Sequence, residues 1–581
     1  MSRTPSWSTK KRARLLSLAC AWAWAWSLGC SSPGDTGALT GGDGDGTPGG
    51  SGGSADSGAA TNPGASADAG AGTDGAAPGA CGLVQTAQGP VLGAATSDAC
   101  TYLGIPFAAP PTGALRWKAP QPAPAWTTPR PSAAASACPQ PASEMGEASN
   151  SEDCLYLNVW VPVATPPQPA PATRPVMVFV HGGGFIVGAA TVPLYDGTKL
   201  ANATGAIVIG LNYRLGPFGF LSGAALRAED PAHPSAGNYG IEDQIAAFQW
   251  VKKNVAAFGG DASNVTVFGE SAGGTSILVH LASPKSAGLF DHAIVESAWA
   301  MPGATAFTTA SADQGGDKLA QALSCTSAAT ALSCLRSKSV DEILKATSGG
   351  PFAGGPAWAP VIDGFVIPDD PVKVFAKGTF NKVPTLIGDN RNEANLFFYV
   401  KGSGMDIPAP TDPVSYWALE ELFYSGHGSA IVAEYPIASF QNDYKAAAAE
   451  AMSDSVFVCG ARRFARALAA AGVPTFRYEF ARNLNIGIAG LGAPHASELP
   501  YVFGNPLDPK TPLVPDDLPV SKQIMAYWGS MAQKGDPNAA GQLAWPRYDA
   551  TQEAQIVLDA TPSTESALKK AKCDFWDGLG L

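Results

Sequence analysis

The chain has 581 residues, a formal net charge of −12 and 45% hydrophobic residues. This apolar fraction can fill the core of a large globular domain. Lysine and arginine cluster only in the first fourteen residues, so the composition argues against a nucleic-acid-binding protein.

The first thirty residues have the layout of an export signal. Basic residues at 3–14 precede the apolar segment "LLSLACAWAWAWSLGC", which ends at Cys30 and is too short and wrongly flanked for a stable membrane span. The "SLGC" ending resembles a bacterial lipoprotein signal, in which the cysteine becomes the acylated first residue, although Ser27 stands where leucine is usual. We expect residues 1–30 to direct export, either of an outer-membrane or cell-surface lipoprotein tethered through Cys30 or of a secreted protein.

Residues 31–80 read as a linker. They consist mainly of glycine, alanine, serine and aspartate, and they contain no aromatic residue, lysine or arginine. Such a segment cannot bury enough apolar surface to offset the entropy of ordering it. A coil of this length reaches roughly 35–40 Å, which suits a tether between a membrane surface and a folded domain.

The composition changes at Cys81, and residues 81–581 are expected to form one α/β domain. Short apolar runs bounded mostly by glycine, proline or polar residues read as buried parallel strands. They cover 176–180, 206–211, 265–268, 292–297 and 383–388. Apolar residues at helical spacing over 241–258 predict a helix that stops at Gly259–Gly260. Alternating strands and helices favour a central, mostly parallel sheet flanked by helices.

The segment 269–273, "GESAG", matches the G-x-S-x-G pattern around Ser271. It follows the strand 265–268 and precedes the apolar helical segment 275–282, which is the context of a nucleophile elbow. Small neighbours are needed there because the turn is tight and strained. The pattern alone also fits an ordinary glycine-rich turn between a strand and a helix.

A second glycine-rich loop, "HGGGF" at 181–185, follows the strand 176–180 directly. Successive glycines leave backbone N–H groups accessible to a ligand, and an H-G-G-G loop of this kind forms part of the oxyanion hole in α/β-hydrolases. Such a loop stabilises the negative charge that develops when a nucleophile attacks a carbonyl group.

A serine nucleophile also needs a general base. In α/β-hydrolases the histidine is the last triad member along the chain. Two of the six histidines, His427 and His495, lie in late loop-like segments, and the residue pattern alone leaves both open. The base must be neutral to accept a proton, so an apparent pKa near 6–7 is expected.

Beyond these features, the chain resembles the type-B carboxylesterase/lipase family, which includes carboxylesterases, cholinesterases and the non-catalytic neuroligins. The resemblance runs from about residue 82 to the C-terminus. It implies an α/β-hydrolase fold with an N-terminal antiparallel hairpin region. The segments similar to family blocks, in family order and spacing, are 102–122, 151–162, 212–222, 237–274 and 495–504.

The resemblance implies a catalytic triad of Ser271, Glu393 and His495, and it removes His427 as a candidate. The family places its glutamate five residues after a glycine that ends a strand, and Gly388 leads in this way to Glu393. Ala394 follows, where the family commonly has glycine. Asp389 is the nearby competitor, but it lies too close to the strand end.

Further positions carry over from the family. Gly183, Gly184 and Ala272 match the three oxyanion donors, and Trp299 falls in the segment that shapes the acyl pocket. A tryptophan there either shortens the pocket or belongs to the core. Two structural ion pairs are also implied, Arg116–Glu152 and Arg214–Asp243.

Eight cysteines lie outside the signal, and an even number in an exported chain suggests disulfides. The resemblance implies the pairs Cys138–Cys154, Cys325–Cys334 and Cys459–Cys573, which leaves Cys81 with Cys100. No C-x-x-C or H-E-x-x-H pattern occurs, so we expect neither a metal nor another cofactor.

The expected function is a serine hydrolase that cleaves carboxylic esters through an acyl-enzyme intermediate. The loop 139–153 contains no tryptophan, tyrosine or phenylalanine to hold a quaternary ammonium group. We therefore expect small neutral esters with short acyl chains as substrates. The alternatives are a lipase or a hydrolase of a specialised natural ester. A neuroligin-like binding module is less expected because all three triad residues are present.

Overall fold

The structure is a computed structural model that describes residues 81–143, 145–163, 173–303, 305–347, 357–401, 406–507 and 512–581. The predicted signal 1–30, with Cys30, and the linker 31–80 lie outside the described residues. Within the described ranges, no helix has both the length and the apolar character that a membrane span requires.

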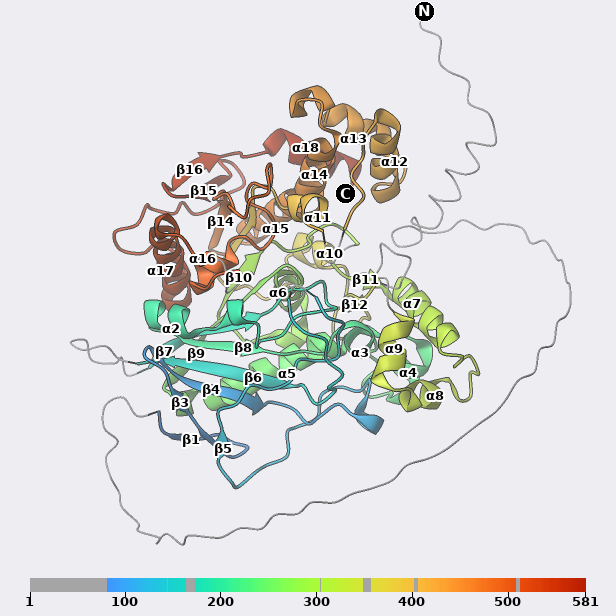
Figure 1. The fold of residues 1–581 in the computed structure, drawn as a ribbon, viewed down its shortest axis with the longest axis vertical. Coiled ribbons are helices and arrows are strands. Elements are labelled where there is room, and N and C mark those ends of the chain that lie inside the picture. The colour runs from blue at the N-terminus through green and yellow to red at the C-terminus, as the bar shows by residue number, and fades with distance from the viewer. Residues whose placement is uncertain are drawn as a thin grey trace, which may run out of the picture.

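The described residues form an eleven-stranded mixed sheet at the centre of the fold (Figure 1). From one edge to the other its strands are β3 (Ala94–Ala95), β4 (Ala99–Pro106), β6 (Tyr156–Pro162), β8 (Ile207–Leu211), β7 (Arg174–Val180), β9 (Gly260–Glu270), β10 (His292–Glu296), β13 (Thr385–Asn390), β14 (Thr475–Phe480), β15 (Ala554–Leu558) and β16 (Ser563–Ser566). Neighbours from β8 to β15 pair in parallel, and both edges are antiparallel. The predicted α/β fold with a mostly parallel sheet is confirmed.

A smaller three-stranded sheet forms the N-terminal hairpin region. β1 (Leu83–Gln85) and β2 (Pro90–Leu92) are antiparallel, and β5 (Arg130–Pro131) pairs in parallel with β2. A further parallel pair joins β11 (Phe307–Thr308) and β12 (Val361–Ile362).

Two hydrophobic cores cover the two faces of the large sheet. One core contains Val176 and Val178 of β7 and packs against α5 (Tyr239–Asn254), α6 (Ala272–Ala282), α10 (Pro371–Ala376) and α15 (Cys459–Ala470). The other contains Met177 and Phe179 of the same strand and packs against α2 (Thr198–Thr204), α16 (Leu499–Phe503) and α17 (Leu518–Lys534). Because both faces are buried, the central strands are continuous apolar runs.

The remaining helices flank this arrangement, mostly at its ends (Figure 1). They are α3 (Gly216–Phe220), α4 (Ala224–Glu229), α7 (Thr309–Ala322), α8 (Ala331–Ser337), α9 (Val340–Ala346), α11 (Asn395–Tyr399), α12 (Pro413–Phe423), α13 (Gly428–Glu434), α14 (Tyr444–Met452) and α18 (Lys570–Leu579). A π-helical turn, Ser453–Val458, joins α14 to α15.

The helix predicted over 241–258 is α5 followed by a 3-10 turn, Val255–Phe258. Gly259 ends it with a left-handed φ of 83°. β9 then begins at Gly260, five residues before the predicted strand start at 265. The sequence "GDASN" at 260–264 carries no apolar run, so its strand conformation could not be seen in the pattern.

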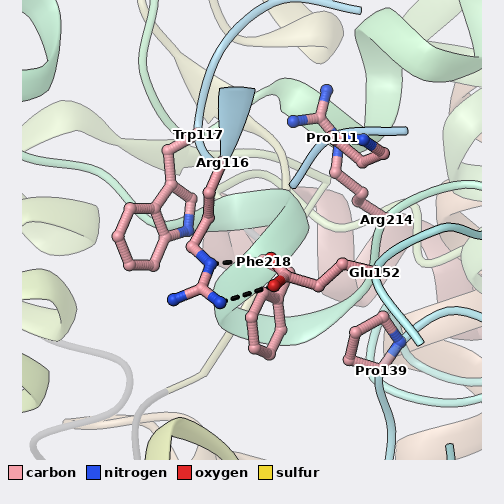
Figure 2. Close-up of a pocket in the computed structure, with 7 residues that line it drawn as sticks. All are labelled: Pro111, Arg116, Trp117, Pro139, Glu152, Arg214 and Phe218. Atoms are coloured by element: carbon pink, nitrogen blue, oxygen red, sulfur yellow. Dashed lines mark hydrogen bonds and ion pairs between the residues drawn. The ribbon is translucent and has the colours of Figure 1, made fainter. Parts of the chain in front are cut away.

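Both ion pairs implied by the resemblance are present and shielded from solvent. Arg116 binds Glu152 through two nitrogen–oxygen contacts, of 2.7 and 2.5 Å, while Arg214 points away from Glu152 (Figure 2). Arg214 instead binds Asp243 at 2.8 and 2.7 Å. Bidentate pairs of this kind fix the position of the segments that carry them.

The described residues also contain the three disulfides that the resemblance implied and the fourth that was left by elimination. They are Cys81–Cys100, Cys138–Cys154, Cys325–Cys334 and Cys459–Cys573.

Candidate active site

Ser271 lies in the sharp turn between β9 and α6. Its backbone has φ 58° and ψ −120°, a conformation that costs a non-glycine residue about 1–3 kcal/mol. The turn depends on small neighbours, because a Cβ atom on Gly273 would lie 1.9 Å from the carbonyl oxygen of Val180. The serine therefore projects from the carboxyl end of the central strand at the N-terminus of a helix.

The glycine loop after β7 lies against this turn. A Cβ atom on Gly182 would lie 3.1 Å from the Cβ atom of Ser271. Gly183 has a φ of 104°, and a side chain there would also meet the carbonyl oxygen of Val187 at 2.2 Å. Ala272 is the first residue of α6, so its N–H has no acceptor within the helix. The structure thus places Gly182, at the start of the glycine loop, beside Ser271, and Ala272 directly after the serine.

Glu393 and His495 form the second half of the site. Glu393 lies between β13 and α11, and its Oε2 is 2.6 Å from Nδ1 of His495, while its Oε1 accepts the N–H of Asn390 at 2.7 Å. Asp389, the competing acid, instead faces Arg477, with 3.4 Å between Oδ2 and Nη2. The geometry therefore favours Glu393 over Asp389 as the partner of the histidine. His427 directly precedes α13 and takes no part in this contact.

The other imidazole nitrogen faces a residue that the sequence analysis missed. Nε2 of His495 lies 3.1 Å from Oε1 of Glu270, the residue before the serine. In this conformation Nε2 has no hydrogen-bond partner among the described residues, so the contact from Ser271 to His495 is not formed. Hydrogen bonds between catalytic groups are often long or poorly aligned and become short only in the complex with substrate. The sequence contained one indication of this contact: Glu270 is a charged residue at the end of an apolar, buried strand.

The imidazole of His495 is surrounded by acidic groups. Burial lowers its pKa, but the neighbouring Glu270, Glu393 and Glu498 raise it, and the pKa lies above the ordinary value of 6.5. Burial also raises the pKa values of the carboxyl groups of Glu270 and Glu498. The expectation of an apparent pKa near 6–7 for the base is therefore revised upward.

The pH dependence of activity tests the raised pKa of His495. If His495 is the base, kcat/KM for a neutral ester is expected to rise with pH through an apparent pKa of about 9, because only the neutral imidazole accepts a proton. At pH 6 the value should be at least about tenfold below the alkaline plateau, since the neutral fraction falls tenfold per unit below the pKa. A plateau already reached at pH 6.5 would contradict the raised pKa. Glu270→Gln should move the midpoint down.

Aromatic side chains line the histidine and the segment after β10. The ring centroids of Phe457 and Phe397 lie 4.9 and 5.5 Å from that of the His495 imidazole. Trp299 is partly buried and packs against the cluster that contains both phenylalanines. Its backbone N–H donates to Oγ1 of Thr275, one helical turn after the serine. Trp299 therefore belongs to the aromatic cluster beside His495, a position that fits a pocket residue and a core tryptophan alike. The sequence analysis missed both phenylalanines.

The residues around Ser271 suit acyl transfer by a serine nucleophile. They provide a hydroxyl at a helix N-terminus, a histidine paired with a buried carboxylate, and a glycine loop beside the serine. Within the described ranges, histidine, cysteine and acidic side chains do not form a group of three or more that could hold a metal ion.

Comparison with known proteins gives consistent matches over the folded region. The family model described as "Carboxylesterase family" (COesterase) matches residues 80–576. Fumonisin B1 esterase of Sphingopyxis macrogoltabida is 36% identical over 491 residues, covering 80% of this chain and 85% of that protein. Cocaine esterase of Oryctolagus cuniculus is 34% identical over 514 residues, covering 82% of this chain and 90% of that protein. The solved structure of a thermophilic PNB esterase has a TM-score of 0.73 and 32% identity, covering 85% of this chain and all of that one.

Proposed function

Because the chain belongs to the carboxylesterase family and is a carboxylic ester hydrolase, we propose that Ser271, His495 and Glu393 perform the hydrolysis. Ser271 attacks the ester carbonyl while His495 takes its proton through Nε2. The Glu393 carboxylate, 2.6 Å from Nδ1, orients the imidazole and stabilises its positive charge. This contact between Glu393 and His495 is the observation that best supports the assignment.

The oxyanion of the tetrahedral intermediate is proposed to bind the backbone N–H groups of Gly183, Gly184 and Ala272. The position of the glycine loop against Ser271 supports this role. Donors fixed in advance stabilise the charge without reorganising, and a single such donor contributes about 10²–10³-fold to kcat. Collapse of the intermediate leaves an acyl-enzyme, and water activated by His495 then releases the acid.

We propose small neutral esters with short acyl chains as the substrates. Trp299 packs against the cluster that contains Phe397 and Phe457, whose rings lie close to His495, and such bulky side chains would leave little room for a long acyl chain. The loop 139–153, closed by Cys138–Cys154, contains no aromatic residue that could bind a quaternary ammonium group. These features favour ester substrates made of an uncharged alcohol and a short carboxylic acid.

A chain-length series tests the pocket. With p-nitrophenyl esters from acetate to decanoate, kcat/KM of the wild type should fall beyond short chains. Trp299→Ala should move the optimum to longer acids, because each newly buried methylene contributes about 0.8 kcal/mol, or roughly fourfold in kcat/KM. Trp417→Ala is the matched control, since that tryptophan is exposed on α12. An unchanged chain-length profile in Trp299→Ala would remove Trp299 from the pocket.

We further propose that the protein is exported and tethered through an acylated Cys30. The disulfides within the described residues support an oxidising compartment, and the signal-like segment 1–30 and the linker 31–80 support a lipid-anchored domain.

Fractionation of the producing cells tests the tether. The wild type should sediment with membranes, and Cys30→Ser should release it, because the several acyl chains of a lipoprotein hold firmly whereas a single chain binds marginally. Cys20→Ser, within the same apolar segment, is the control and should leave the wild-type pattern intact. Wild-type protein found wholly soluble outside the cell would contradict the anchor and leave ordinary secretion.

A further inference from the structure

The long helix that contains α14 and α15 is interrupted beside the active site. The segment Ser453–Val458, here called the π-turn, is π-helical and lies between the two α-helices. A π-helical turn is rare, occurs mostly as a single turn inside an α-helix and is frequently found at functional sites. The described side chains of the π-turn are buried except for that of Val456, which is partly buried. The interruption is therefore an internal feature of the fold.

Two residues of the π-turn contact the proposed acid and base. Oγ of Ser453 accepts the N–H of Ala394 at 2.9 Å, which fixes the peptide that follows Glu393, and donates to the carbonyl oxygen of Ala449 at 2.8 Å. The ring of Phe457 lies with its centroid 4.9 Å from that of the imidazole of His495, at an interplanar angle of 48°. One short segment thus reaches both members of the Glu393–His495 pair.

The π-turn also contacts the segment of the proposed acyl pocket. The carbonyl oxygen of Val456 accepts the N–H of Ala300 at 3.1 Å, directly after Trp299. The carbonyl oxygen of Val458 accepts from Nη2 of Arg477 on β14 at 3.0 Å. These bonds tie the turn to the sheet and to the loop that follows β10.

Its other contacts anchor the turn to surrounding helices. Asp454 binds Nζ of Lys569 at 2.5 Å and the hydroxyl of Tyr435 at 2.8 Å. Cys459 follows the turn at once and is bonded to Cys573 of α18. Figure 1 shows α12, α13, α14 and α18 gathered at one end of the molecule, so the π-turn joins this helical group to the catalytic centre.

We propose that the π-turn is a positioning element for the catalytic acid and base, with Ser453 and Phe457 as its positioning residues. The proposal rests on the proposed triad. Glu393 fixes only Nδ1 of the imidazole, and in the structure Nε2 faces Glu270. Phe457 restricts the plane of the ring, and Ser453 restricts the loop that carries the acid. Small displacements of catalytic groups cost rate more than they cost binding.

The test compares substitutions at the π-turn with a matched one further along the same helical run. Phe457→Leu keeps an apolar side chain but removes the aromatic ring, and Ser453→Ala removes the acceptor of the Ala394 N–H. Phe464→Leu is the control, because Phe464 is an equally buried phenylalanine of α15 that packs against Phe375. All are assayed with p-nitrophenyl acetate, and the imidazole signal of His495 is followed by NMR in protein labelled at histidine.

Phe457→Leu and Ser453→Ala are each expected to lower kcat at least about tenfold, with KM within about threefold of the wild type, as misplacement of catalytic groups predicts. The His495 signal should shift in Phe457→Leu because the ring current is lost. Phe464→Leu should leave kcat and the signal unchanged. If Phe457→Leu does not fold, the kcat of Ser453→Ala alone tests the proposal.

The inference is overturned if the folded π-turn variants keep wild-type kcat, or if Phe464→Leu lowers kcat as much as they do. Ser271→Ala separates this outcome from failure of the proposed function. An inactive Ser271→Ala with active π-turn variants refutes the positioning role alone, whereas an active Ser271→Ala refutes the triad and the positioning role with it.

Discussion

Replacing Ser271 or His495 with alanine, or Glu393 with glutamine, is expected to lower kcat by about 10³-fold or more. Ser271→Ala removes the attacking oxygen, and His495→Ala removes the proton acceptor. Glu393→Gln keeps the shape of the side chain but loses the negative charge 2.6 Å from Nδ1. Combining the changes should add little, because the residues act as one unit. The measurement is kcat with p-nitrophenyl acetate for folded, purified variants.

Asp389→Asn is the matched control for the acid. Asp389 is also buried, lies four residues before Glu393 and faces Arg477 instead of the histidine. Burial raises the pKa of its carboxyl group to about 7, so the group carries no charge below that pH, as in the asparagine variant. Activity lost in Asp389→Asn but kept in Glu393→Gln would reverse the assignment of the acid.

Loss of the Cys459–Cys573 disulfide is expected to give the largest change in stability. The bond spans 114 positions, and constraining so long a loop in the unfolded chain corresponds to about 4.8 kcal/mol in the chain-entropy model. The double variant Cys459→Ser/Cys573→Ser should lose stabilisation of this order. Denaturant unfolding under oxidising conditions measures it, and non-reducing peptide mapping should recover the two cysteines as one linked pair.

The Cys325–Cys334 disulfide provides the internal comparison. It spans only 9 positions, for which the same model gives about 2.6 kcal/mol. The double variant Cys325→Ser/Cys334→Ser should therefore be destabilised less. Equal losses of unfolding free energy in the two double variants would contradict loop closure as the source of the stabilisation. A free thiol at Cys459 in exported protein would show that the Cys459–Cys573 disulfide does not form.

Much of the fold follows from local patterns in the sequence. The strands at 176–180 and 265–268 could be predicted because the central sheet is buried on both faces, which makes each strand an unbroken apolar run. Ser271 and the glycine loop could be predicted because their geometry excludes larger neighbours. At Gly273 and Gly183, close backbone approach leaves room for glycine alone.

Other features depend on contacts between distant segments and have no local signature. Residues 453–458 contain apolar side chains compatible with an ordinary helix, so the π-turn could not be predicted from them. Nor could the contact of Glu270 with His495, because it joins the end of β9 to a loop more than two hundred positions later in the chain. Phe457 reaches the imidazole only through the same long-range packing.

The strand order of the central sheet has a consequence for how the molecule is made. From β3 to β16 the strands follow one another in chain order across the sheet, except that β7 and β8 exchange places. As the chain is synthesised from its N-terminus, each new strand can therefore pair with the edge of the sheet that is already formed. Few strands need a partner that is synthesised much later. Ser271 is in place early, but His495 and Cys573 come from the last part of the chain. If His495 is the base, a chain that lacks its last hundred residues cannot hydrolyse esters, so activity marks a molecule whose synthesis is almost complete.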